Sequence, residues 1–238
     1  MHNKYFIIYN GQTNLDFGVS VVTRPSKPSP IMEYEEKPAP GRDGKLYIEK
    51  GYGDIEISIS FNFISKNNNN WEKDFRVLKR WLLNKGNDKL DKLKFSDDLE
   101  VFYKVSKVSI DTPERVLKRI GRFNVTFTCN PYTYLEDGQN ELSLPNTLYN
   151  DNYLAKPIYK ITGEGVLTLN VNGHVIKANV GQILTIDTEL GLCYRTDGTF
   201  NNTALTAYYE DMYLIEGDNT FSYSGNFDIK IIPNWRCI

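Results

Sequence analysis

The stretch from Gly121 to Gly138, GRFNVTFTCNPYTYLEDG, places a strand and then a stop near the middle of the chain. Its first part alternates apolar and polar residues, which is the period-two pattern of a strand with one buried face: Phe123, Val125 and Phe127. Pro131 lacks a ladder donor, and Asp137-Gly138 is a turn signal. The stretch therefore predicts that a first sheet ends here and that the chain forms two domains, residues 1–138 and 139–238.

The composition favours a mainly β protein and does not favour nucleic-acid binding. The 238 residues include 16 Tyr and 12 Phe, and aromatic residues favour strands. The 28 basic and 30 acidic residues form no sustained basic block, so a nucleic-acid partner is not expected. No segment approaches the roughly 18 apolar residues of a membrane span, and the first apolar run is too short for a signal peptide. We expect a chain made in the cytoplasm, with no membrane partner.

The first half is predicted to form a sheet with one packed helix. Alternation is clearest in residues 55–63, and Lys45–Glu49 is expected to pair with that strand as a hairpin, connected near residues 52–54. Asn10-Gly11 predicts a tight turn. The other expected strands are residues 4–9, 17–24, 92–96, 99–110 and 119–129, with a turn at Asp97-Asp98.

A proline-rich segment lies between the expected strands at residues 17–24 and 45–49. Residues 25–44 contain five prolines and end in Gly41-Arg42-Asp43-Gly44. This composition predicts an extended, poorly hydrogen-bonded arm that closes in a tight turn. Two interpretations remain open: an arm that reaches a neighbouring surface, or a surface loop of the same domain.

Residues 71–84 are predicted to form the single helix. Its apolar stripe at helical spacing is made by Trp71, Phe75, Leu78 and Leu82, widened by Val77 and Trp81. The asparagines at 67–70 are expected to cap its start and Gly86 to end it. The other side is basic, and we interpret it as a solvated surface rather than a nucleic-acid or membrane face: Lys73, Arg76, Lys79, Arg80 and Lys85.

The second half is predicted to be all β, with no helix. Turn signals recur at the spacing of a β-sandwich, and Asn172-Gly173 predicts a type I′ hairpin. The expected strands are residues 158–162, 166–171, 174–178, 183–187, 192–195, 219–224 and 227–233.

The sequence gives no catalytic, cofactor-binding or metal-binding motif. The two histidines, His2 and His174, are expected at a terminus and after a hairpin turn, where a solvated imidazole is the simpler interpretation. Two acidic pairs, Asp187 with Glu189 and Asp97 with Asp98, leave a carboxylate hydrolase as a minor alternative, although both have the positions of hairpin-end residues. No enzyme is predicted.

Cysteines and aromatic residues carry two further expectations. Cys129, Cys193 and Cys237 are widely spaced and odd in number, which predicts free thiols, with Cys129 a small apolar residue at a sheet margin. Exposed aromatic rings can stack on sugars, so an alternative function is a carbohydrate-binding module that recognises host cell-surface saccharide. Its candidate residues are Tyr208, Tyr209, Tyr213 and Trp235, for which core packing or subunit contact is the more common role.

Three segments of the first half together resemble a known family. They are PGRDGKLYIEKGYGDIEISISFNF (40–63), WEKDFRVLKRWLLNKG (71–86) and VTFTCNPYTYLEDG (125–138). In this order and spacing they are similar to the N-terminal domain of the phage distal tail protein, Dit, of the siphophage-type tail component family. The second half, from KPIYKITGEGVLTLNVNGHVIKANV to the terminal IIPNWRCI, resembles the C-terminal β-sandwich of that family.

The resemblance implies both an architecture and a role. It implies an N-terminal sandwich-like or barrel-like domain with one helix, which builds a hexameric ring, and a galectin-like C-terminal β-sandwich that projects from it. It also implies a place at the tip of the phage tail. There the ring would join the tail tube protein to the tail-associated, tail fibre and receptor-binding proteins of the baseplate.

Overall fold

The chain forms two β-rich units joined through one long strand. The structure, a computed structural model, describes residues 4–41, 43–65, 71–83 and 92–238. The first unit comprises the chain up to Thr133 together with Ile238, and the second runs from Tyr134 to Cys237. Strand β10 (Ile120–Leu135) leaves the first unit and contributes its last two residues to the second. The mainly β prediction is confirmed.

One antiparallel sheet dominates the first unit, with the strand order β2-β1-β7-β8-β10-β6-β3 and β9 beside β10. The remaining bounds are β1 (Ile7–Tyr9), β2 (Gln12–Thr13), the 3₁₀ helix η1 (Asn14–Phe17), β3 (Val19–Val21), β6 (Ile55–Ile64), β7 (Lys92–Phe95), β8 (Asp98–Ile110) and β9 (Glu114–Arg115). Asn10 and Gly11 both have positive φ, 50° and 71°, as the tight turn between β1 and β2 requires.

The sheet is curled rather than flat. The rings of Tyr9 on β1 and Phe127 on β10 lie 5.2 Å apart, although β7 and β8 separate these strands in the sheet. In a flat sheet the two strands would be roughly 14 Å apart. The curl supports the sandwich-like or barrel-like domain that the sequence predicts.

A buried asparagine bridges the two ends of the curled sheet. The Oδ1 atom of Asn14 accepts a hydrogen bond from the Ile7 N–H at 2.8 Å, and its Nδ2 donates to the Val19 carbonyl, also at 2.8 Å. Ile7 belongs to β1 and Val19 to the edge strand β3, so one side chain connects opposite ends of the strand order. The side chain is fully buried, so both backbone groups depend on it.

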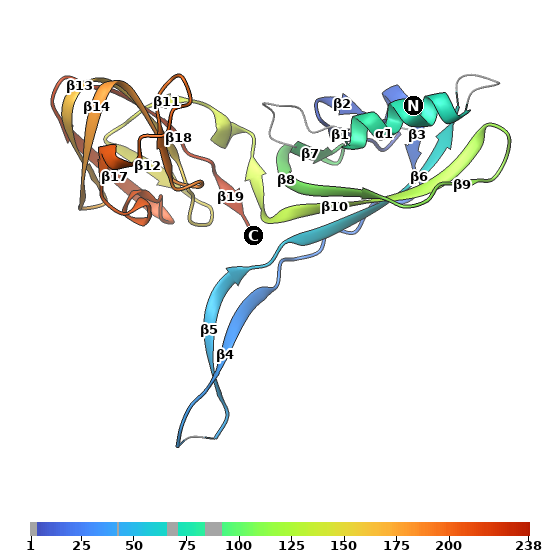
Figure 1. Cartoon of the computed structure of the whole chain (residues 1–238), viewed down its shortest axis with the longest axis horizontal. Helices are drawn as coiled ribbons and strands as arrows, with labels where there is room; N and C mark the ends of the chain where they lie inside the picture. Colours follow the sequence, from blue (N-terminus) through green and yellow to red (C-terminus); the bar gives the residue numbers. More distant parts are fainter. Residues whose placement is uncertain (1–3, 42, 66–70, 84–91) are drawn as a thin grey trace. The chain divides into compact units, whose positions relative to one another are not determined.

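Helix α1 (Trp71–Leu83) covers one face of this sheet (Figure 1). Trp71 stacks on Phe75 at 4.9 Å between ring centroids, and the Trp81 indole N–H donates to the Tyr9 carbonyl at 2.9 Å. Val77 is 44% exposed, so its expected place in the buried stripe is wrong. The predicted asparagine cap and the stop at Gly86 lie outside the described residues.

The expected pairing of Lys45–Glu49 with residues 55–63 is wrong. Strand β5 (Lys45–Tyr52) pairs with β4 (Met32–Pro38), while β6 pairs with β10 from Ile55↔Cys129 to Ile64↔Ile120. The buried face of β6 needs a partner with a matching apolar face, and β10 supplies one, with Phe61 opposite Phe123. The predicted lack of hydrogen bonding in the arm is wrong as well, because residues 32–38 pair with β5 along their length, with one irregularity between Glu33 and Tyr34.

Strand β10 also continues through Pro131, contrary to the predicted stop. Its ladder with β6 ends at Cys129, because β6 begins at Ile55, so Pro131 lies beyond that ladder. The chain then turns in η2 (Asp137–Gln139), where Gly138 is buried. A Cβ atom at Gly138 would lie 2.5 Å from the Trp235 backbone nitrogen, so only glycine allows these two chain segments to approach.

The second unit is organised by one long hairpin. β13 (Ile158–Val171) and β14 (His174–Asp187) pair along their full length, joined by Asn172 and Gly173 with φ values of 52° and 90°. The predicted type I′ turn is confirmed. The other elements are β11 (Leu142–Ser143), β12 (Thr147–Asn150), β15 (Leu192–Tyr194), η3 (Asn202–Ala204), β16 (Leu205–Thr206), η4 (Tyr209–Met212), β17 (Gly217–Ser224), β18 (Asp228–Ile232) and β19 (Arg236–Cys237).

Two different strands share the other edge of β13. Its first residues pair with β18, at Ile158–Thr162, and its last residues pair with β17, at Thr168–Val171. Between them Gly163 and Gly165 have positive φ, 153° and 108°, and bend the strand. The four strands that the sequence separates in this region are therefore two continuous bent strands. The likeness to galectins stays a prediction.

Replacing Asn14 should destabilise the protein through two orphaned backbone groups. We expect Asn14→Ala to lower the free energy of unfolding by about 2–4 kcal/mol, because the Ile7 N–H and the Val19 carbonyl lose their partners in the core. Asn124→Ala is the matched control, because its two side-chain hydrogen bonds are exposed and should contribute less than about 1 kcal/mol. Urea unfolding measures both, and equal losses would contradict the bridging role of Asn14.

Gly138→Ala should also be costly. The new methyl group would push against the Trp235 backbone and strain the hydrogen bond from the Asn234 N–H to the Gly138 carbonyl. We expect a loss of about 1–3 kcal/mol in the free energy of unfolding. Gly181→Ala is the control, because a Cβ there meets nothing within 4 Å. Thermal unfolding that is unchanged in Gly138→Ala would show that the close approach is unimportant.

Candidate functional site

The acidic pair Asp187 and Glu189 is engaged in structure. The Oδ1 atom of Asp187 accepts hydrogen bonds from the backbone N–H groups of Glu189, at 3.0 Å, and Leu190, at 2.9 Å. The Glu189 Oε1 accepts from the Tyr134 hydroxyl at 2.8 Å. Asp187 thus shapes the turn after β14, and Glu189 holds the start of the second unit. This is the hairpin-end role that the sequence favours.

The other acidic and histidine candidates do not form one cluster in the part of the chain that the structure describes. Asp97 faces Lys27, with 3.4 Å between Oδ1 and Nζ, and its neighbour Asp98 is exposed at the start of β8. The His174 Nδ1 lies 3.4 Å from the Asp211 Oδ1 on an open surface, and His2 lies outside the described residues. Across the ranges that the structure describes, no three His, Cys, Asp or Glu side chains gather as metal ligands would.

The three cysteines are free thiols in the structure. Cys129 is fully buried on β10, and burial raises the pKa of its thiol to about 12. Burial also raises the pKa of Cys193, whose sulfur lies 3.5 Å from the Tyr209 hydroxyl. Cys237 is half-buried. Since the thiolate is the reactive form, Cys129 is a packing residue and not a nucleophile.

The aromatic residues proposed for sugar stacking do not form a common platform. Tyr209 and Trp235 pack against the core of the second unit, and the Lys156 ammonium lies 5.1 Å from the centre of the Tyr213 ring. Tyr208 is 77% exposed and stands alone. Among the described residues, none of these four rings is stacked on another. The carbohydrate alternative therefore lacks an assembled site.

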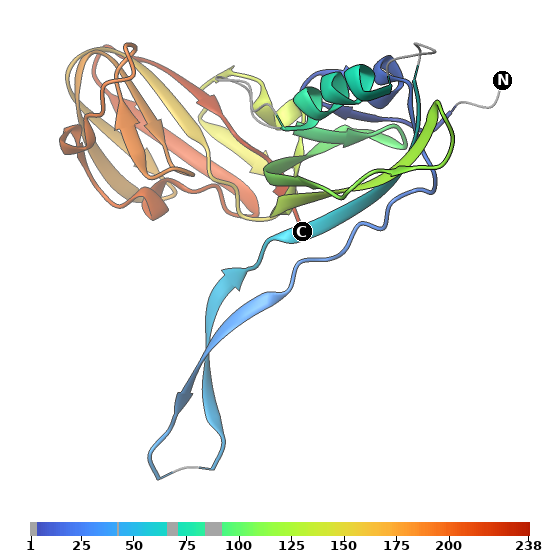
Figure 2. The same ribbon diagram turned by 45° about the vertical axis from the view of Figure 1, so that its right-hand side comes forward.

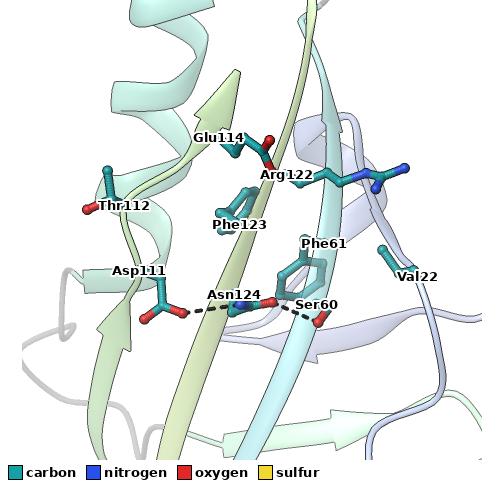
Figure 3. Close-up of a pocket in the computed structure, with 9 residues that line it drawn as sticks. All are labelled: Val22, Ser60, Phe61, Asp111, Thr112, Glu114, Arg122, Phe123 and Asn124. Atoms are coloured by element: carbon teal, nitrogen blue, oxygen red, sulfur yellow. Dashed lines mark hydrogen bonds between the residues drawn. The ribbon is translucent and has the colours of Figure 1, made fainter. Parts of the chain in front are cut away.

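A polar hollow of about 470 Å³ opens on the first unit (Figure 3). Ser60 donates to the Asn124 Oδ1 at 2.7 Å, and the Asn124 Nδ2 donates to Asp111 at 3.2 Å. Arg122 on β10 lies opposite Glu114 on β9 at its rim. The side chains of Ser60 and Asn124 are already hydrogen-bonded, and neither a nucleophile–base pair nor a carboxylate dyad is formed there. The hollow is polar surface on the sheet.

The most distinctive surface is the hairpin of β4 and β5, which we call the arm. Figures 1 and 2 show the two strands running together with no third strand beside them, and they form a separate two-stranded sheet. No residue of either strand is buried. Large apolar side chains are exposed on or next to it: Ile31 (79%), Tyr34 (51%), Leu46 (48%) and Tyr47 (59%).

The two faces of the arm differ in character. One face carries Tyr34 and Tyr47, whose rings meet edge to face with centroids 6.1 Å apart. Ion pairs flank the apolar groups, because Glu36 pairs with Lys45, and Glu35 pairs with both Lys37 and Lys50. An isolated two-stranded hairpin is only marginally stable in water, and its exposed apolar faces have the composition of an interface. The arm is therefore the candidate surface for protein association.

Comparison with known proteins gives the class of this chain. Residues 10–129, about half of the sequence, match the family model described as "Phage tail protein RIFT-related domain". The chain belongs to this family of phage tail proteins. A search of curated protein sequences finds no match. No helix in the described part of the chain is long and apolar enough to cross a membrane.

Solved structures place the fold more narrowly. The chain is similar to the Dit (gp 19.1) protein of phage SPP1, described as a paradigm of the hub adsorption apparatus in phages that infect Gram-positive bacteria. The TM-score is 0.68 at 12% identity, over 98% of this chain and 99% of that one. A chain of the phage P2 baseplate in its activated conformation with Ca matches with a TM-score of 0.54 at 11% identity, over 100% and 99% of the chains. The resemblance to distal tail proteins is thus confirmed, and this chain has their fold.

Thiol labelling should distinguish the three cysteines. At pH 8 a thiol reagent should modify Cys237 first, while Cys129 and Cys193 should react only as the protein unfolds. Because the pKa of Cys129 is higher in the folded chain, its contribution to stability is full below the unfolded thiol pKa and is lost as pH rises toward about 12. Mass spectrometry locates the label, and rapid modification of native Cys129 would contradict the structure.

Proposed function

We propose that the chain is a distal tail hub protein that assembles as a hexameric ring and joins the tail tube to the baseplate. The arm is the observation that carries this proposal, because a hairpin with exposed apolar residues on both strands gains stability only when another surface covers it. The family match and the fold of SPP1 Dit support the same role. In this proposal the proline-rich segment is an arm that reaches a neighbouring surface, and not a surface loop of its own domain.

The parts of the chain have different roles in this proposal. The first domain, residues 1–138 in the sequence prediction, builds the ring, and the second, 139–238, projects from it. The partners are copies of the same chain, the major tail tube protein, and the tail-associated, tail fibre and receptor-binding proteins of the baseplate. The protein is a non-enzymatic virion component at the tail tip, synthesised in the host cytoplasm.

A ring requires two different surfaces on each copy. A head-to-tail interface joins one surface of a subunit to another surface of the next, and it closes when the rotation per step divides a full turn. The arm provides one of the two surfaces. Strands of seven and eight residues extend roughly 25 Å, which is enough to reach a neighbouring copy.

Removing the aromatic pair of the arm should prevent assembly. We expect Tyr34→Ser combined with Tyr47→Ser to shift the protein from rings to folded monomers, because the two rings lose their contact with the neighbour. Tyr149→Ser combined with Tyr208→Ser is the matched control, since those tyrosines are 64% and 77% exposed in the second unit. Native mass spectrometry and electron microscopy measure the copy number.

Two outcomes would oppose the proposal. A wild-type protein that stays monomeric at high concentration, with no ring even beside its tail partners, would remove the hub function. A double arm variant that forms rings as well as the wild type would show that the aromatic pair of the arm is not needed for association.

A further inference from the structure

The outward side of α1 carries a basic groove with an apolar floor, which we call the helix face. Lys73, Arg76, Val77 and Arg80 line it. Arg76 and Arg80 are one helical turn apart, so their side chains project from the same side. Neither arginine has an ion-pair partner among the described residues, and Val77 between them is 44% exposed. The groove therefore presents two uncompensated guanidinium groups beside an exposed apolar side chain.

The arm carries the complementary groups. Most of its charges are neutralised internally, but Glu49 has no ion-pair partner in the part of the chain that the structure describes. Glu49 stands opposite Tyr34 in the β4–β5 register, so the aromatic face of the arm has a free carboxylate at its edge. A guanidinium group both pairs with a carboxylate and stacks on an aromatic ring, which lysine does less well.

We propose that the arm of one copy docks on the helix face of the next, with Glu49, which shares a face of the arm with Tyr34, directed toward Arg76 and Arg80. The inference rests on the proposed ring, and it supplies the second surface that a head-to-tail interface requires. Tyr34 and Tyr47 cover Val77 and the stems of the arginines. Because part of the attraction is between charges at a surface, association weakens as the salt concentration rises.

Charge reversal on each surface tests the contact in the full chain. One variant carries Arg76→Glu and Arg80→Glu, and the other carries Glu49→Arg. Each alone should self-associate about tenfold or more weakly than the wild type, because like charges then face each other. All three positions are exposed, and circular dichroism checks that both variants are folded. Lys107→Glu with Lys177→Glu is the control, since it reverses two exposed charges elsewhere and should assemble normally.

An equal mixture of the two variants gives the decisive result. In an alternating ring the reversed arm meets the reversed helix face, and each unchanged arm meets an unchanged helix face. A ring with six copies, an even number, can close in this way, so the mixture should recover nearly wild-type association. A folding defect in either variant could not produce such recovery. Sedimentation velocity measures the association of each variant and of the mixture.

The possible failures are distinguishable. If both variants assemble as well as the wild type, the inferred contact is wrong, but the proposed ring is not contradicted. If only the arm variant is impaired, or if the mixture does not recover, the arm docks on another surface and the inference is overturned. A helix-face variant that keeps its ring but loses a tail partner would assign that face to the partner. A wild-type chain that never assembles would remove both the hub function and this contact.

Discussion

The first unit depends on the closure of its curled sheet by Asn14. A sheet that curls until β1 and β3 approach leaves backbone groups at its ends without strand partners, and a buried donor or acceptor without a partner is costly. The amide of Asn14 has one donor side and one acceptor side, and it satisfies a group on each strand. With the ends fixed, the core side chains and α1 can pack inside the curl.

The arm differs from this closed sheet because it is not closed around a core. Its strands pair with each other and neutralise most of their charges, yet they have no core to cover their apolar side chains. Such an element is of little use to an isolated subunit and becomes useful in an assembly. A closed domain that holds its shape and a hairpin left uncovered together fit a subunit of a larger structure, as expected of a phage tail protein.

Some residue roles in the candidate site could be predicted from the sequence, and others could not. The turn-forming role of Asp187 and the packing role of Cys129 follow from their positions near strand ends, and the structure agrees. The prolines at 25, 28 and 30 marked the segment that leads to the arm but not the ladder beyond it, because residues 32–37 contain no proline and look like ordinary polar chain. No local pattern marks Asn14, because its partners lie on strands at opposite ends of the sheet.

The sequence by itself determined the local elements: the alternating strands, the amphipathic helix, and the Asn-Gly turns at 10–11 and 172–173, because periodicity and turn chemistry act between neighbours in the chain. It also determined the family resemblance, through the order of several such elements. Only the tertiary structure decided which strand pairs with which, so that β6 joins β10 and β5 joins β4. It also decided that β10 runs through Pro131 and that Gly138 packs against Trp235. Strand pairing and the close approach of two chain segments depend on contacts between residues that are distant in sequence. The apolar faces of those residues must match, and their side chains must fit together without overlap.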